Sequence, residues 1–252
     1  MSVARENLKE FFFISPHWDE KSQRLLGTVG FEFEIAEKAF ERLYKLSVLL
    51  TDSAGPKWTI SEGDAAELAI LARAFVDHAV RIQKLFKSMA KKDGELWQNC
   101  EDFFQQNSDL FSLRDALHHV ESRIHSGVGL DEKQPAHGDF SWKCVVPPDK
   151  LDCFWVAFGP TVIGEFAGPV MSTSCSLRQP IDQLIYRAHG ISVDLFLTLI
   201  NIDKFVTNAH TIFANSLKNQ LAEQGIVRDE LSEEKAGIGL HGRLRIAGLS
   251  IT

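Results

Sequence analysis

Residues Glu62–Lys91 read EGDAAELAILARAFVDHAVRIQKLFKSMAK, in which apolar residues recur every three or four positions. Such spacing places them on one face of an α-helix. Ser61 is a good cap for the first turn, where Glu62 and Asp64 complement the helix dipole. We therefore predict a long helix with one buried seam, made of Leu68, Leu71, Phe75, Ala79, Ile82, Phe86 and Met89.

A second long helix is predicted immediately before this one, over about Gly30–Thr51. Glu34 and Lys38 lie four residues apart with the acid first, which is the favourable order on a helix surface. Gly55-Pro56 ends the segment, and the short connection predicts that the two helices pack as an antiparallel pair. The apolar stripe of this helix comprises Ala36, Phe40, Leu43, Leu46 and Leu50.

The rest of the chain alternates between helical and strand-like periods. Between residues 131 and 179, Pro135 and Pro147-Pro148 indicate a loop-rich stretch. Further helices are predicted over about Glu95–Gln105, Ser112–His125 and Leu195–Glu223, with Ser112 as an N-cap. Two hairpins are predicted: Phe154–Phe158 with Thr161–Phe166, and Leu184–Arg187 with Ile191–Asp194.

These elements predict a mainly α fold, a helical bundle with a small antiparallel β insertion before the last long helix. We expect residues 1–225 to form a single helical domain with the insertion at about 140–194. Residues 226–252 are Gly-rich, and we expect a weakly ordered C-terminal tail with a short strand at Leu244–Ile246.

The composition limits the classes of function. The 252 residues include 27 Lys and Arg and 34 Asp and Glu, a net charge of −7, and 44% are hydrophobic, which is typical of an ordinary soluble domain. The absence of excess positive charge argues against a sequence-independent nucleic-acid binder, and we expect no DNA partner. The sequence has no apolar run of membrane-spanning length and no signal-peptide pattern, so we expect a cytoplasmic protein with no membrane partner.

The sequence gives no indication of a cofactor. Cys100, Cys144, Cys153 and Cys175 form no C-x-x-C pair, and we expect them to be reduced, partly buried side chains rather than zinc ligands. The glycines form no dinucleotide or phosphate-binding fingerprint. We therefore expect neither a metal centre nor a bound cofactor.

One run carries residues suited to chemistry. Leu113–Ile124 reads LRDALHHVESRI, in which Arg114-Asp115 is followed by His119. This run resembles the HEPN superfamily, whose signature is an Arg, usually a polar Asn, Asp or His, three to five further residues and a His. The resemblance covers about twelve residues and implies a metal-independent ribonuclease or a toxin- or defence-type effector. It also implies a homodimer, because in HEPN families two protomers commonly form the catalytic cleft.

The residue types fit metal-independent RNA cleavage. That reaction needs a base for the 2′-hydroxyl and a cation for the phosphate that gains charge in the transition state. An imidazole such as His119 suits the first task, and the guanidinium of Arg114 suits the second. Asp115 would orient Arg114 or cap the helix. His118, four residues from Arg114 and nearly on the same helix face, is the alternative partner.

A second hypothesis remains open. The same charged residues can be ordinary surface groups on the helix of a non-catalytic interaction or dimerisation protein. Elsewhere, His78 follows Asp77 beside the apolar seam, which favours a structural histidine, and His137-Gly-Asp139 lies in the predicted loop, from which it could reach a site. Four aromatic residues alternate as in a strand and are predicted to be core: Trp142, Phe154, Trp155 and Phe158.

Overall fold

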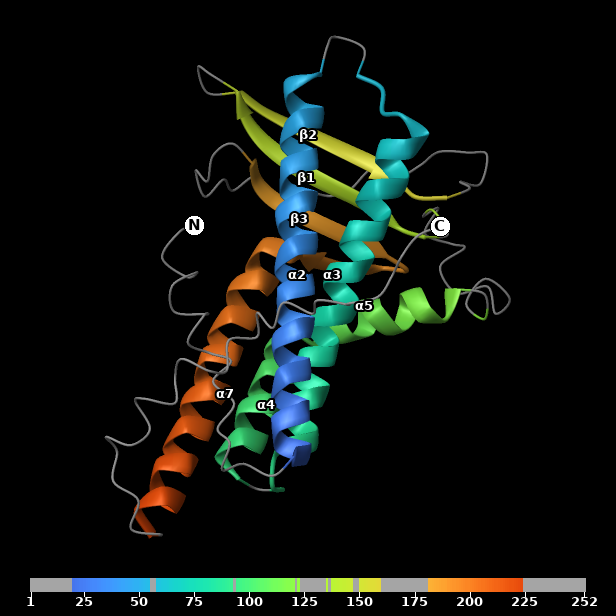
Figure 1. Cartoon of the computed structure of the whole chain (residues 1–252). Coiled ribbons are helices and arrows are strands. Elements are labelled where there is room, and N and C mark those ends of the chain that lie inside the picture. Colours follow the sequence, from blue (N-terminus) through green and yellow to red (C-terminus); the bar gives the residue numbers. More distant parts are fainter. Residues whose placement is uncertain are drawn as a thin grey trace, which may run out of the picture.

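The computed structural model describes residues 20–54, 58–92, 94–120, 122, 135, 137–146, 150–159 and 181–223. Two long helices, α2 (Glu20–Asp52) and α3 (Glu62–Met89), lie side by side and antiparallel (Figure 1). The predicted helix pair is therefore confirmed, although α2 begins ten residues before the predicted Gly30. Ser61 caps α3 as expected, because its hydroxyl oxygen accepts the backbone N–H of Asp64 at 3.0 Å.

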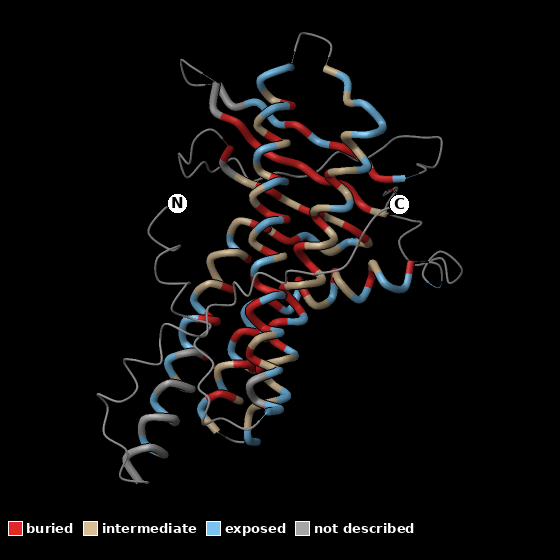
Figure 2. The backbone as a smooth tube through the Cα atoms, viewed as in Figure 1, coloured by how far each residue is buried: buried red, intermediate tan, exposed pale blue. Residues whose placement is uncertain are grey.

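The facing sides of α2 and α3 form the centre of the core (Figure 2). Phe40 of α2 and Phe75 of α3 are fully buried, with ring centroids 5.5 Å apart. Five of the seven predicted seam residues of α3 are buried, whereas Leu71 and Met89 are partly buried against the same core. The periodicity therefore identified the buried face correctly, because helical geometry alone brings these side chains to one side.

Two short helices, α4 (Glu95–Gln106) and α5 (Ser108–His118), follow α3. The prediction that the second would begin with Ser112 as N-cap was wrong, because α5 begins at Ser108, and its predicted end at His125 lies outside the described residues. Asn107 is both the C-cap of α4 and the N-cap of α5, so the chain resumes a helix immediately. The Asn107 side chain stabilises this junction: its Nδ2 donates to the Phe103 carbonyl at 2.9 Å and its Oδ1 accepts from Asn201 at 3.0 Å.

The β insertion is a four-stranded antiparallel sheet in the order β2-β1-β3-β4. The predicted hairpin of β3 and β4 is confirmed, whereas the predicted strand Thr161–Phe166 lies outside the described residues. The antiparallel neighbour of β2 is β1, a segment that we expected to be loop. The strands are β1 (Asp139–Val146), β2 (Lys150–Ala157), β3 (Ile181–Ala188) and β4 (Ile191–Asp194).

The error over β1 has a simple cause. Prolines 135 and 147–148 lie on either side of the strand and do not interrupt it, and Phe140, Trp142 and Cys144 alternate with polar residues as in a strand. These three residues are buried in the core, where the Trp142 indole donates to Thr51 Oγ1 of α2 at 2.9 Å. Phe154 and Phe158 are also buried as predicted, but Trp155 is 43% exposed.

The last long helix, α7 (Leu195–Glu223), spans the residues predicted for it. The side chain of Asp194 caps the start of this helix, because its Oδ1 accepts hydrogen bonds from the backbone N–H groups of Phe196 and Leu197 at 2.9 and 3.2 Å. Phe205 of α7 stacks on Phe103 of α4, with ring centroids 4.5 Å apart. The fold is thus mainly α with a small antiparallel β insertion before the last helix. Residues 226–252, the predicted tail, lie outside the described part of the chain.

No helix among the described residues is both long enough and apolar enough to cross a lipid bilayer. Among the cysteines, Cys100, Cys144 and Cys153 are free thiols, and Cys175 lies outside the described residues. Cys100 and Cys144 are buried as expected, but Cys153 is exposed. Burial raises the pKa of the Cys100 thiol to about 12, which keeps this group protonated and unreactive near neutral pH.

Candidate functional site

Helix α5 carries three residues of the predicted site, Arg114, Asp115 and His118, and the fourth, His119, is its C-cap. Because α5 begins at Ser108, Arg114 is the seventh residue of the helix and does not lie in the first turn. The predicted N-cap at Ser112 would have placed Arg114 in the first turn. His118 lies in the last turn of the helix.

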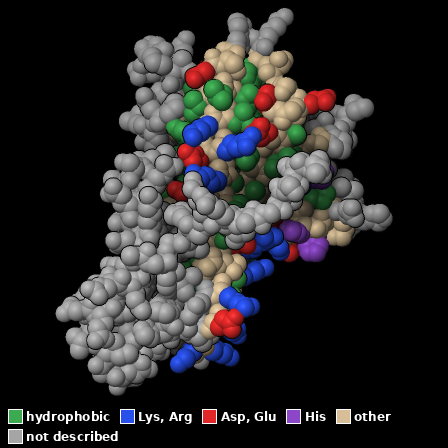
Figure 3. Space-filling model, viewed as in Figure 1, with side chains coloured by type: hydrophobic (Ala, Val, Ile, Leu, Met, Phe, Trp, Pro, Cys, Tyr) green, Lys and Arg blue, Asp and Glu red, His purple; other side chains and the backbone are tan. Residues whose placement is uncertain are grey.

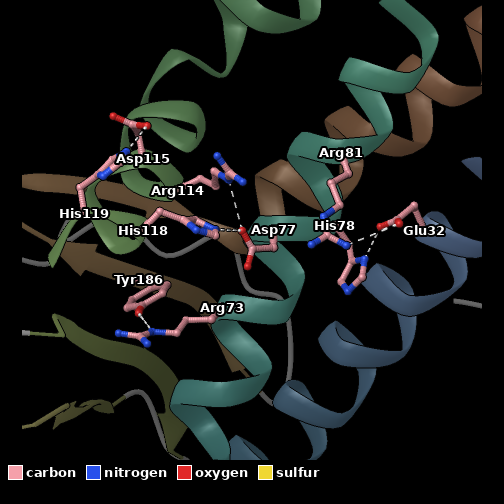
Figure 4. Close-up of polar contacts among 10 residues, drawn as sticks. All are labelled: Glu32, Arg73, Asp77, His78, Arg81, Arg114, Asp115, His118, His119 and Tyr186. Carbon is pink, nitrogen blue, oxygen red and sulfur yellow. Dashed lines mark hydrogen bonds and ion pairs between the residues drawn. The ribbon is translucent and has the colours of Figure 1, made fainter. Parts of the chain in front are cut away.

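Arg114 and His118 converge on one carboxylate of α3. Arg114 Nε lies 3.3 Å from Asp77 Oδ1, and His118 Nε2 lies 2.7 Å from the same oxygen (Figure 4). The Arg114 side chain is 25% exposed and that of His118 is 42% exposed. The contact thus places a guanidinium and an imidazole side by side at the surface where α5 meets α3.

The contact with Asp77 defines the proton arrangement of His118. An ionised carboxylate can only accept hydrogen bonds, so Nε2 of His118 carries the proton. In the neutral imidazole the lone pair is then on Nδ1, which is the nitrogen available to remove a proton from another molecule. A carboxylate that fixes the tautomer and orientation of a histidine is a recurrent arrangement in general-base catalysis.

Asp115 and His119 lie on a different side of α5. His119 Nε2 is 3.6 Å from Asp115 Oδ1, which is an ion-pair distance rather than a hydrogen bond. Both side chains are about 60% exposed and point away from Asp77 (Figure 4). Within one chain the structure therefore brings Arg114 together with His118, and no hydrogen bond or ion pair among the described residues joins Arg114 to His119.

A second polar cluster is formed by Arg73, His137 and Tyr186, and its arginine lies on the same helix as Asp77. That these residues come together was not predicted from the sequence. Arg73, one turn earlier on α3, has Nη2 at 2.8 Å from His137 Nδ1 and Nε at 3.4 Å from the Tyr186 hydroxyl oxygen. That hydroxyl donates to the His137 carbonyl at 3.2 Å. The spacing of four between Arg73 and Asp77 was the available signal, since it places both on one helix face.

The position of His137 depends on two glycines. Gly138 has φ +84°, and a Cβ there would lie 2.2 Å from the Arg187 carbonyl oxygen. A Cβ on Gly159 would lie 2.7 Å from His137 Cδ2. Any larger residue at these places would displace the backbone or the imidazole, so glycine is needed to keep the ring against Arg73. Burial and the charge of Arg73 lower the pKa of His137.

Two neighbouring ion pairs are structural. His78 Nδ1 is hydrogen-bonded to Oε2 of Glu32 on α2, and Oε1 of the same carboxylate lies 3.7 Å from Arg81 Nη1. This histidine therefore has a structural partner, as predicted, and it faces away from Asp77 (Figure 4). On β1, Asp139 accepts from Arg187 Nε at 2.9 Å. Burial raises the pKa of Asp139, and the nearby guanidinium opposes that effect.

The surface around the candidate site is mixed in charge. On the face shown in Figure 3, histidine side chains lie beside Lys and Arg side chains where α5 meets α3. Within the described part of the chain, no three His, Cys, Asp or Glu side chains are close enough together to hold a metal ion. No protein-family model, no curated protein and no solved structure matches the chain.

Proposed function

We propose that this chain is a HEPN-like, metal-independent endoribonuclease, of the kind used as a toxin or defence effector, and that it acts as a homodimer. The observation that carries the proposal is the convergence of Arg114 and His118 on Asp77, because it supplies a phosphate-binding cation beside an oriented base. The resemblance of Arg114-Asp115 and His119 to the HEPN signature supports the same class of reaction.

The proposed chemistry assigns one role to each group. His118 Nδ1 takes the proton of the ribose 2′-hydroxyl, and the 2′-oxygen forms a bond to phosphorus while the bond to the 5′-oxygen breaks. The leaving 5′-oxygen takes up a proton from water, and the products are a 2′,3′-cyclic phosphate and a 5′-hydroxyl end. Arg114 stabilises the extra negative charge on the phosphate oxygens. His119, exposed at the end of α5, is available to a second copy of the chain.

A second candidate function is a non-catalytic interaction or dimerisation protein. The observation that favours it is the Arg114–Asp77 ion pair, which links α5 to α3 and can serve purely to hold the two helices together. In that case RNA is not cleaved, and substitutions in the cluster change stability alone.

Cleavage of single-stranded RNA in EDTA tests the proposal. The wild-type protein should cleave, and Arg114→Ala and His118→Ala should each lose about 10²- to 10⁴-fold in rate, the usual contribution of a positioned acid or base. Arg42→Gln is a matched control, since Arg42 is an exposed arginine that pairs with Glu67 and has no contact with Asp77, Arg114 or His118 among the described residues. Equal activity in all proteins, or activity in none, would exclude the ribonuclease.

A further inference from the structure

Arg73 is a half-buried cation that lacks an anionic partner. Its guanidinium contacts two neutral groups, the imidazole of His137 and the hydroxyl of Tyr186. Within the described residues no carboxylate lies within 4.0 Å of it, and Asp77, one turn away on α3, pairs with Arg114 and His118 instead. Charged groups that are removed from water are usually paired, so an unpaired guanidinium in this position points to an anion supplied from outside the chain.

The donors that remain on Arg73 and His137 fit such an anion. A guanidinium has five N–H groups and no acceptor, and two of those of Arg73 are engaged. Because the guanidinium can only donate, Nδ1 of His137 must be the acceptor, and in the neutral ring Nε2 carries the proton. Nε2–H has no hydrogen-bond partner among the described residues. Three guanidinium N–H groups and one imidazole N–H are therefore available.

This set of donors is adjacent to the proposed catalytic residues. Arg73 and Asp77 are four residues apart on α3, and Figure 4 shows Arg73 and Tyr186 on the side of Asp77 that also faces His118. Burial raises the pKa of Tyr186 above its ordinary value, the charge of Arg73 lowers this pKa, and the charge of Asp77 raises it. An anion bound at Arg73 would thus lie next to a phosphate bound at Arg114.

We propose that Arg73 and His137 form a phosphate-binding subsite, which holds an RNA backbone phosphate neighbouring the one that is cleaved. The inference rests on the proposed function and deepens it, because it assigns an extended single strand rather than a lone nucleotide as the substrate. Arg73 supplies a planar pair of donors that matches two phosphate oxygens, and His137 supplies a neutral donor. Tyr186 is a positioning residue, since it holds Arg73 through Nε.

Equilibrium binding of a fluorescent 2′-O-methyl RNA oligomer tests the subsite. The oligomer lacks the free 2′-hydroxyl and cannot be cleaved by transesterification, so binding is measured apart from catalysis. Arg73→Gln should weaken binding about tenfold or more and reduce the slope of log K against log salt by about 0.7, the value for one lost phosphate contact on a single strand. His137→Ala should weaken binding without changing the slope, because His137 contributes no charge.

Further variants separate a structural defect from a lost contact. Arg73→Lys keeps the charge and loses the fork of donors, so it should retain the wild-type slope with lower affinity. Arg42→Gln removes an exposed arginine remote from the cluster and should keep both the affinity and the slope. Circular dichroism and thermal unfolding of each variant check that the fold is retained.

The outcomes are distinct. An Arg73→Gln protein that binds as the wild type does, or a wild-type protein that does not bind the oligomer, overturns the subsite. Arg73-dependent binding of inorganic phosphate without binding of the oligomer also overturns it, in favour of a free-phosphate site. A wild-type protein that binds the oligomer through Arg73 but does not cleave RNA in EDTA keeps the subsite and excludes the ribonuclease.

Discussion

The imidazole of His118 donates to the carboxylate of Asp77 at 2.7 Å, although the two residues are 41 positions apart and belong to different helices. The same oxygen of Asp77 accepts from Arg114 at 3.3 Å. Asp77 thus holds the two side chains of α5 that are best suited to phosphate chemistry in one place.

Replacing Asp77 by Asn should impair cleavage while leaving the size of the side chain unchanged. The amide can accept or donate, so it no longer fixes the proton of His118 on Nε2, and it loses the charge that attracts Arg114. We expect the rate of RNA cleavage in EDTA to fall about 10²-fold or more. Asp102→Asn on α4, an exposed acid remote from the site, is the control and should cleave as the wild type does. Equal rates for all three proteins would show that Asp77 does not orient a base.

Mixing inactive subunits should reveal which chain supplies each histidine. Arg114 and His118 meet within one chain, so Arg114→Ala mixed with His118→Ala should stay inactive in every dimer. If His119 acts across the two-fold axis, Arg114→Ala mixed with His119→Ala should regain about a quarter of the wild-type activity, because half of the dimers then hold one complete site.

The dimer itself is checked by sedimentation of the wild-type protein over a range of concentrations. A monomer at all concentrations that supports cleavage would contradict the shared cleft. Recovery of activity in the mixture of Arg114→Ala and His118→Ala would contradict the assignment of both residues to one chain.

Two phenylalanines of α2 should contribute very differently to the stability of the protein, because only one of them is buried. Phe40 is 1% exposed and packs between Phe75 and Phe196, whereas Phe31 on the same helix is 63% exposed. Phe40→Ala should lower the free energy of unfolding by about 3–5 kcal/mol because it leaves a cavity in the core. Phe31→Ala should change it by less than about 1 kcal/mol. Urea unfolding of the two variants measures the difference, and similar losses would contradict the helix packing.

The stability of the protein should depend on pH through His137. Burial and Arg73 lower the pKa of His137 in the folded chain below its ordinary value of 6.5, so the unfolded chain binds the proton more readily. This contribution to stability is therefore present above about pH 6.5 and is lost as the pH falls below it. The variant His137→Gln lacks the titrating group.

Urea unfolding at several pH values between about 7.5 and 5 checks this prediction. The free energy of unfolding of the wild type should fall more steeply with decreasing pH than that of His137→Gln. If the free energy of unfolding depended on pH in the same way in both proteins, the imidazole of His137 would be exposed to water and not packed against Arg73.

The helical part of the fold was predictable because local periodicity determines it. The seam of α3 and the stripe of α2 predicted two long helices, a buried face for each and their antiparallel pairing. The bounds of α7 were also correct, and the hairpin of β3 and β4 was predicted, although β3 begins three residues before the predicted Leu184. In each case the signal lies within one stretch of chain, through side-chain spacing, a cap or a glycine turn.

The errors occurred where context changed the meaning of a local signal. Asn107 joins α4 to α5 through contacts with Phe103 and Asn201, so a residue that interrupts one helix also begins the next. Around β1, prolines 135 and 147–148 suggested a loop, whereas they flank a strand whose apolar residues pack against the helices. Neither outcome follows from a single segment.

Side-chain spacing along the chain was enough to predict the long helices and the apolar faces that they bury, and it placed Arg114, Asp115, His118 and His119 on one segment. The partnership of Asp77 with Arg114 and His118, and the contact of Arg73 with His137 and Tyr186, emerge only when the chain is folded. The difference arises because helical periodicity is a property of neighbouring residues. The meeting of charged groups from distant segments depends instead on how packed helices and strands are oriented around a common core.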